Sequence, residues 1–165
     1  MDSGTQGLNG LRDSMDSGTQ WTQGQNKMGY ENGGVMDNKR FEELEVWKSA
    51  RKISNIIWDI TESDGFSRDY TLINQIRGAS LSVMSNISEG HERDGDKEYM
   101  QFLSYAKGSA GEVRSQLYMA LDRGYINRKK FDEIYDMLIS QSRMLKAFIK
   151  YLAGKGYKEK KYKRV

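Results

Sequence analysis

The chain has 165 residues, enough for one hydrophobic core. It contains no cysteine, which excludes disulfides and thiolate metal sites, and no proline, which allows long unbroken helices. No apolar run approaches the roughly 20 residues that span a bilayer, and no signal peptide is recognisable, so we expect a cytoplasmic protein without a membrane partner. The formal net charge is +3, and it is distributed unevenly along the chain.

Residues 1–35 are predicted to be a disordered, low-complexity leader. They are rich in Gly, Ser, Asn, Gln and Thr, and they carry two basic and four acidic side chains. So few aliphatic side chains cannot offset the entropy that is lost on folding. The segment Met1–Gln6 returns as Met15–Gln20. Two interpretations stay open: a flexible interaction arm, or a linker or upstream sequence ahead of a start at Met36.

Two amphipathic helices are predicted next. The first runs from about Phe41 to about Thr61 and ends before the turn-forming pair Asp64-Gly65. The second runs from about Arg68 to about Glu89, with Ser67 as its N-cap and Gly90 as its terminator. Their core positions recur at helical spacing: Leu44, Trp47, Ala50, Ile53, Ile57 and Ile60 in the first helix, and Leu72, Ile76, Ala79, Val83 and Ile87 in the second.

Two longer helices follow. One starts near Asp96 and continues to Arg123, where Gly124 ends it, and the other begins after the N-cap Asn127 and runs to about Ala153. Their core positions are Leu103, Ala106, Ala110, Val113, Leu117 and Ala120, then Phe131, Ile134, Leu138, Gln141, Leu145, Phe148 and Leu152. Four such helices with short connections predict an all-α fold, an antiparallel up-down-up-down four-helix bundle over residues 36–153.

Further apolar side chains lie off these core positions, among them Trp58, Phe102, Tyr105 and Met119. Large exposed apolar patches usually mark interfaces, so we expect the bundle to self-associate.

Residues 154–165 form a basic C-terminal tail. Residues 36–153 hold 18 basic and 18 acidic side chains, whereas the tail holds six basic and one acidic. Lysine neutralises phosphates and tyrosine stacks on unpaired bases. The predicted nucleic-acid-binding residues are therefore Lys155, Lys158, Lys160, Lys161, Lys163, Arg164, Tyr157 and Tyr162. A tail that only raises solubility is the alternative.

A resemblance to a known family rests on four stretches. Residues 75–93 read QIRGASLSVMSNISEGHER and resemble the signature of the four-helix-bundle family named after proteins encoded in 23S ribosomal RNA intervening sequences. Phe41–Trp47, Phe102–Glu112 and Gly124–Ile126 resemble its opening, its third helix and its last turn. The resemblance implies a non-enzymatic bundle that forms rings, often pentamers. A related branch, the accessory variability proteins of diversity-generating retroelements, binds nucleic acid and a reverse transcriptase.

The motif positions are interpreted as structural or interface residues. We expect Arg77 to pair with an acid across an interface, with Glu112 as one candidate, and Asn86 and Glu89 to hold the backbone of the following loop. The small residues from Gly108 to Gly111 predict close packing against a helix or a subunit. The full set is Gln75, Arg77, Asn86, Glu89, Gly90, Gly108, Ser109, Ala110 and Glu112.

Sharper alternatives for the same stretches are a ligand groove at the small residues, an acid/base pair of Glu89 with His91, and a cation site among the acids between Glu89 and Glu98. Gly78 stands where the family pattern has a second arginine, which weakens the case for RNA contact through this helix.

Together these features predict a non-enzymatic, homo-oligomeric helical scaffold or adaptor that binds RNA or other nucleic acid electrostatically. The resemblance favours a pentamer. The alternative is a protein-binding accessory module, for example a partner of a reverse transcriptase. No catalytic residue, cofactor or metal site is predicted.

Overall fold

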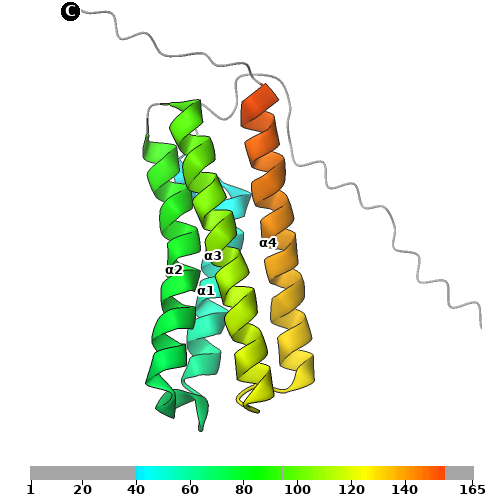
Figure 1. Ribbon diagram of the computed structural model, residues 1–165. Coiled ribbons are helices and arrows are strands. Elements are labelled where there is room, and N and C mark those ends of the chain that lie inside the picture. Colours follow the sequence, from blue (N-terminus) through cyan, green and yellow to red (C-terminus); the bar gives the residue numbers. More distant parts are fainter. Residues whose placement is uncertain (1–39, 94, 155–165) are drawn as a thin grey trace, which may run out of the picture. The chain divides into compact units, whose positions relative to one another are not determined.

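The computed structural model describes residues 40–93 and 95–154, and within these ranges every regular element is helical. The four α-helices are α1 (Glu45–Thr61), α2 (Tyr70–Glu92), α3 (Asp96–Asp122) and α4 (Arg128–Gly154). Short 3₁₀ helices, η1 (Phe41–Glu43) and η2 (Phe66–Arg68), precede α1 and α2. Consecutive helices run in opposite directions, which confirms the predicted bundle (Figure 1).

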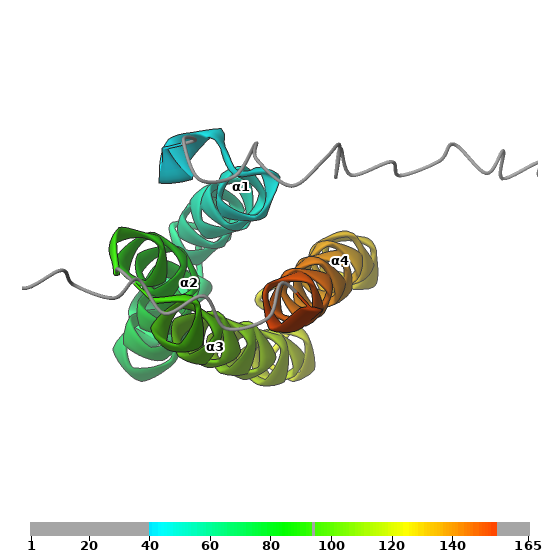
Figure 2. The same ribbon diagram turned by 90° about the horizontal axis from the view of Figure 1, so that it is seen from above.

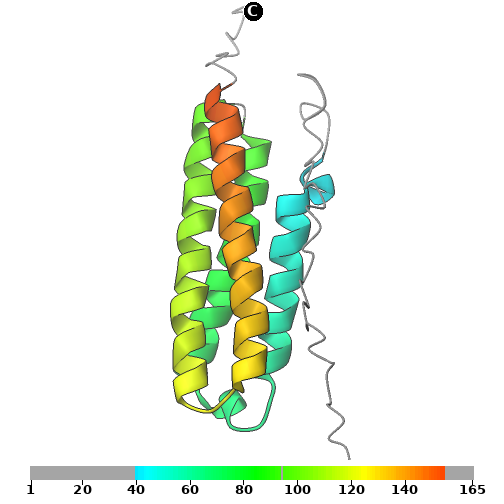
Figure 3. The same ribbon diagram turned by 90° about the vertical axis from the view of Figure 1, so that its right-hand side faces the viewer.

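The helices follow one another around the bundle axis, so that α1 lies across from α3 and α2 across from α4 (Figure 2). Among neighbouring helices, the contact between α2 and α3 is the most extensive and that between α1 and α4 is the least extensive. α4 runs along the whole length of the bundle (Figure 3). None of the described helices is long and apolar enough to cross a membrane.

The core of α3 and α4 is confirmed at every predicted position, from Leu103 to Ala120 and from Phe131 to Leu152. In α1 the prediction is partly wrong, because Trp47 and Ile60 are only half-buried while Val46 is buried. The buried face of α1 also includes two polar residues, Ser54 and Thr61. Because these two polar residues interrupt the apolar pattern, helical periodicity alone predicted a buried face of α1 that is rotated slightly from the observed one.

Both predicted boundaries of the second helix need correction. Ser67 lies in η2, and the N-cap of α2 is Asp69, whose carboxylate accepts a hydrogen bond from the backbone N–H of Leu72 at 3.0 Å. Gly90 does not terminate the helix but lies buried within it, and α2 continues to Glu92. Leu72 is half-buried, and Ile73 takes the core position at this end.

The boundaries between α3 and α4 agree with the sequence. Gly124 follows α3 with a φ of +72°, a conformation that glycine adopts without strain. Asn127 caps α4, because its side-chain oxygen accepts a hydrogen bond from the backbone N–H of Lys130 at 2.9 Å. The predicted leader and the tail from Lys155 onward lie outside the described residues.

One polar side chain occupies the centre of the core. Gln141 is fully buried on α4, and its amide nitrogen donates to the backbone carbonyl of Val46 on α1 at 2.9 Å. Its oxygen Oε1 is buried and has no hydrogen-bond partner in the described part of the chain, and the space beside it is too small to admit a water molecule. An unpartnered carbonyl in such a place opposes folding.

Replacing Gln141 by methionine is expected to raise the free energy of unfolding by about 1–2 kcal/mol, because the unpartnered oxygen is removed while the length of the side chain is kept. The Val46 carbonyl keeps its intrahelical N–H partner in α1. Urea denaturation of the full chain measures the change. Gln141→Ala is the control, and the cavity that it leaves lowers stability. A less stable methionine variant would show that the bond to Val46 outweighs the unpaired oxygen.

Candidate functional site

Arg77, from the family motif, binds the C-terminal end of α1. Its Nε donates to the hydroxyl of Thr61 at 2.7 Å and its Nη2 donates to the carbonyl of Trp58 at 3.4 Å. The guanidinium lies 4.1 Å from the centroid of the Trp58 ring and 3.9 Å from a carboxylate oxygen of Glu62. A cation at this helix end satisfies free carbonyls and complements the helix dipole. Arg77 therefore fixes α1 on α2.

Within the chain, Arg77 does not pair with Glu112. Glu112 is exposed on α3, and the partners of Arg77 lie on α1 and at its C-cap. Both residues flank a core stripe in the sequence, but only the packing of the helices decides which neighbour each one meets.

Asn86 and Ser109 belong to a small polar cluster between α2 and α3. The amide of Asn86 donates to the carbonyl of Ser82 at 2.7 Å and to its hydroxyl at 3.0 Å. Ser109 donates from α3 to the same Ser82 hydroxyl at 3.0 Å. Asn86 thus bonds one turn back along its own helix, and the expectation that it holds the following loop is wrong.

Glu89 also acts differently from the expectation. Its carboxylate accepts a hydrogen bond from Nη2 of Arg93 at 2.7 Å, and the Arg93 guanidinium lies 5.2 Å from the centroid of the Phe102 ring. Glu89 therefore orients a side chain at the C-cap of α2 rather than the loop backbone. The pairing with His91 is not formed, because His91 lies 3.6 Å from Glu92 and packs edge-on against the Tyr99 ring.

α3 approaches α2 closely at Gly90, where the sequence predicted a helix end. A Cβ atom on Gly90 would stand 2.7 Å from Cβ of Phe102 and 2.8 Å from the Tyr99 ring. Burial raises the pKa of Tyr99 above its ordinary value, and its hydroxyl has no hydrogen-bond partner among the described residues. Glycine is required here because α3 occupies the place of a side chain.

The small-residue segment of α3 divides between two faces. Ser109 and Ala110 are buried, as the close-packing interpretation requires. Gly108 has no atom within 4 Å of a would-be Cβ, and Gly111 meets only the end of Arg114 at 3.9 Å. Within this chain the two glycines are therefore not needed for helix packing. The predicted close packing against a neighbouring helix is wrong at Gly108 and Gly111.

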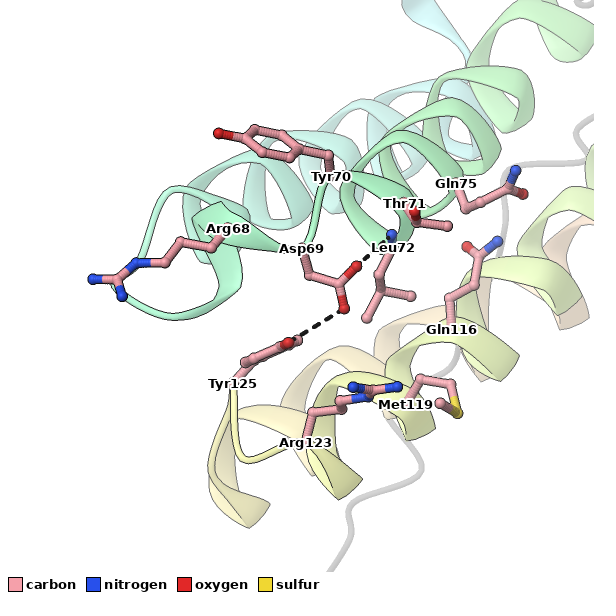
Figure 4. A pocket seen from close by; sticks show the side chains of 10 residues that line it. All are labelled: Arg68, Asp69, Tyr70, Thr71, Leu72, Gln75, Gln116, Met119, Arg123 and Tyr125. Carbon is pink, nitrogen blue, oxygen red and sulfur yellow. Dashed lines mark hydrogen bonds between the residues drawn. The ribbon is translucent and has the colours of Figure 1, made fainter.

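An open cleft of about 690 Å³ lies between the first turns of α2 and the last turns of α3 (Figure 4). The Asp69 carboxylate at its edge accepts from the backbone of Leu72 at 3.0 Å and from the Tyr125 hydroxyl at 3.2 Å. Gln75 on α2 and Gln116 on α3 lie on facing sides of the cleft (Figure 4). The lining residues are Arg68, Asp69, Tyr70, Thr71, Leu72, Gln75, Gln116, Met119, Arg123 and Tyr125.

Of these residues, only Gln75 was among the predicted structural or interface positions, and it was predicted from the motif rather than from a cleft. The two halves of the lining are about 45 residues apart in the chain, and no periodic or spacing signal connects them. Among the described residues, no group of histidine and acidic side chains is arranged to hold a metal ion. The eight predicted nucleic-acid-binding residues, from Lys155 to Arg164, lie outside the described part of the chain.

Comparison with known proteins agrees with the motif. The family model of the 23S rRNA-intervening sequence proteins matches residues 42–147, which include α1, α2, α3 and most of α4. The chain belongs to the 23S rRNA-intervening sequence protein family.

One solved structure supports the fold of this family member. A protein of unknown function from the S23 ribosomal protein family of Bacteroides thetaiotaomicron superposes with a TM-score of 0.59 at 18% sequence identity. The match covers 64% of this chain and 98% of that chain. No curated protein matches.

Substituting Gly90 by alanine is expected to lower the free energy of unfolding by about 1–3 kcal/mol, because the added methyl group must displace Phe102 and Tyr99. Gly78→Ala on the same helix is the matched control. Nothing lies within 4 Å of its would-be Cβ, so this variant gains up to about 1 kcal/mol from helix propensity. Thermal and urea denaturation compare the two. Equal effects of both substitutions would contradict a close approach at Gly90.

Proposed function

We propose that this protein is a non-enzymatic helical adaptor whose C-terminal tail binds RNA electrostatically. The observation that carries the proposal is the separation of charge along the chain. Residues 36–153 hold 18 basic and 18 acidic side chains, while residues 154–165 hold six basic and one acidic. A polyanion is attracted by net positive charge that releases its counterions. The tail is the segment that supplies such charge.

Local ion pairs on the bundle support this assignment. Several basic side chains are paired one turn along their own helix, as in Arg93–Glu89 at 2.7 Å and Lys130–Glu133 at 2.6 Å. Exposed pairs of this kind contribute little to stability, but the acidic partner of each pair offsets the positive charge of the basic side chain beside it. Residues 36–153 thus carry no net positive charge with which to attract phosphates.

Neutralising the tail is expected to abolish most RNA binding. The variant replaces all six basic tail residues, Lys155, Lys158, Lys160, Lys161, Lys163 and Arg164, by glutamine in the full chain. For single-stranded RNA, six phosphate contacts give a slope of about −4 in a plot of log affinity against log salt, and the slope should approach zero in the variant. Fluorescence anisotropy across salt concentrations measures both slopes.

The matched control removes the same number and kind of charges from the bundle. It replaces exposed side chains without an ion-pair partner among the described residues: Lys52, Lys97, Lys107, Lys129, Arg143 and Lys146. Net charge is then equal in the two variants, so only the position of the charge differs. The tail is not the RNA-binding element if the tail variant still binds RNA tightly, or if both variants lose RNA affinity equally. Either result would leave the surface of the bundle as the place where partners bind.

We also propose that the bundle assembles into a homo-oligomeric ring. The resemblance to the family implies that this ring is a pentamer. Large apolar side chains that remain exposed support this proposal, above all Tyr105 on α3, which is 52% exposed, and Leu81 on α2, which is 43% exposed. Gly108 adds open backbone one turn from Tyr105. Assembly would also strengthen RNA binding, because several tails on one particle raise the effective concentration of each.

Tyr105→Glu is expected to shift the protein towards lower mass, because it places a charge on this apolar surface. Ser140→Glu is the control, since it adds the same charge between Asp136 and Arg143 on an exposed polar face of α4. Sedimentation velocity at several concentrations measures the masses. An unmodified chain that stays monomeric at high concentration would contradict the assembly, and an unchanged mass in the tyrosine variant would exclude this surface.

A further inference from the structure

We propose that the RNA strand held by the tail continues onto the outer face of α4, where Arg143, Lys146 and Lys150 contact its phosphates. This inference rests on the proposed binding of RNA by the tail. α4 ends at Gly154, the first residue of the tail, so the two basic segments follow one another directly in the sequence. The last turns of α4 lie at the end of the bundle where α2 ends and α3 begins (Figure 1).

The neutral balance of residues 36–153 conceals an uneven distribution of charge along α4. From Arg128 to Asp136 the helix carries three basic and three acidic side chains, and Arg128 pairs with Asp132 at 2.9 Å. From residue 137 to Gly154 it carries three basic side chains and no acidic one. The second part of α4 therefore has a net charge of three minus zero, or +3.

The three basic side chains of this part share one face of the helix. Their spacings of three and four residues place Arg143, Lys146 and Lys150 on the same side of α4, over about 10 Å of its length. All three are exposed, and none forms an ion pair with a described residue. No other described helix lies in front of α4 where the bundle is viewed from its outer side (Figure 3). These three residues are the basic face of α4.

The stability of the bundle does not account for the basic face. Like charges one turn apart on a helix repel each other. The helix dipole favours basic groups within the last turn, and the last turn of α4 contains none. Acids at the starts of α1 and α3 are engaged by other bases, since Glu45 pairs with Lys48 at 2.8 Å and Glu98 lies 3.9 Å from Arg93. A polyanion along the basic face would relieve the repulsion.

The chemistry of the basic face suits phosphate groups. The planar guanidinium of Arg143 can donate two parallel hydrogen bonds to one phosphate, and the two lysines provide compact positive charges beside it. Contacts to phosphates position a strand without reading its bases. The basic face therefore contributes affinity for single-stranded RNA and no preference for a sequence.

The test measures the salt dependence of binding to a fluorescein-labelled oligouridylate by fluorescence anisotropy. Each phosphate contact of single-stranded RNA contributes about −0.7 to the slope of log affinity against log salt. Six tail contacts alone give about −4, whereas nine contacts of the tail and the basic face give about −6. Replacing Arg143, Lys146 and Lys150 by glutamine in the full chain should therefore change the slope from about −6 to about −4. Glutamine matches the helix propensity of the basic residues, so the fold is kept.

A matched control removes one arginine and two lysines from other surfaces. Arg68→Gln, Lys52→Gln and Lys129→Gln change exposed residues that form no ion pair with a described residue. The control has the same net charge as the α4 variant and should keep the slope of about −6. In NMR spectra of the unmodified chain, the oligouridylate should shift the amide resonances of residues 143–150 more than those of residues 128–136.

The results separate this inference from the tail proposal. With the basic face in place, neutralising the six basic tail residues should leave a slope of about −2 rather than zero. A slope of about −4 in the unmodified chain that the α4 variant does not change would overturn the inference and leave the tail proposal standing. Equal losses in the α4 variant and its matched control would also overturn it. A slope that depends on the α4 variant but not on the tail variant would contradict the tail proposal and support the basic face.

Discussion

The close packing of α2 against α3 is the contact on which the remaining features depend. It requires a backbone without a side chain at Gly90, where Phe102 and Tyr99 occupy the place of a Cβ atom. In the middle of the helices, the hydroxyl of Ser82 accepts hydrogen bonds from Asn86 and Ser109 and so links the two surfaces. These part-buried hydrogen bonds help to fix the register, because a shift of one helix would break the bond between Ser82 and Ser109.

This contact also creates the cleft. At the end of the bundle remote from Gly90, the first turns of α2 and the last turns of α3 present Gln75, Gln116 and Arg123 to the same space. Asp69 serves both elements there, because it caps α2 and accepts a hydrogen bond from Tyr125, which follows α3. The geometry of the cleft is thus fixed by the same residues that end the helices.

The family motif specifies how the helices pack. Arg77 closes the end of α1, Asn86 bonds to its own helix, Glu89 orients Arg93, and Gly90 admits α3. Each of these side chains is accounted for by helix ends or helix contacts, and this explains why membership of the 23S rRNA-intervening sequence protein family defines a fold more sharply than an activity. The basic tail, on which the proposed function rests, and the cleft lie mostly outside the motif.

The sequence by itself determined the four helices, the complete core stripes of α3 and α4, and the cap at Asn127, because helical periodicity and capping depend on residues within a few positions of each other. Only the tertiary structure decided the partner of Arg77, the place of Gly90 inside α2, and the meeting of Gln75 with Gln116. These features join segments far apart in the chain, and their geometry follows from how whole helices pack rather than from local spacing.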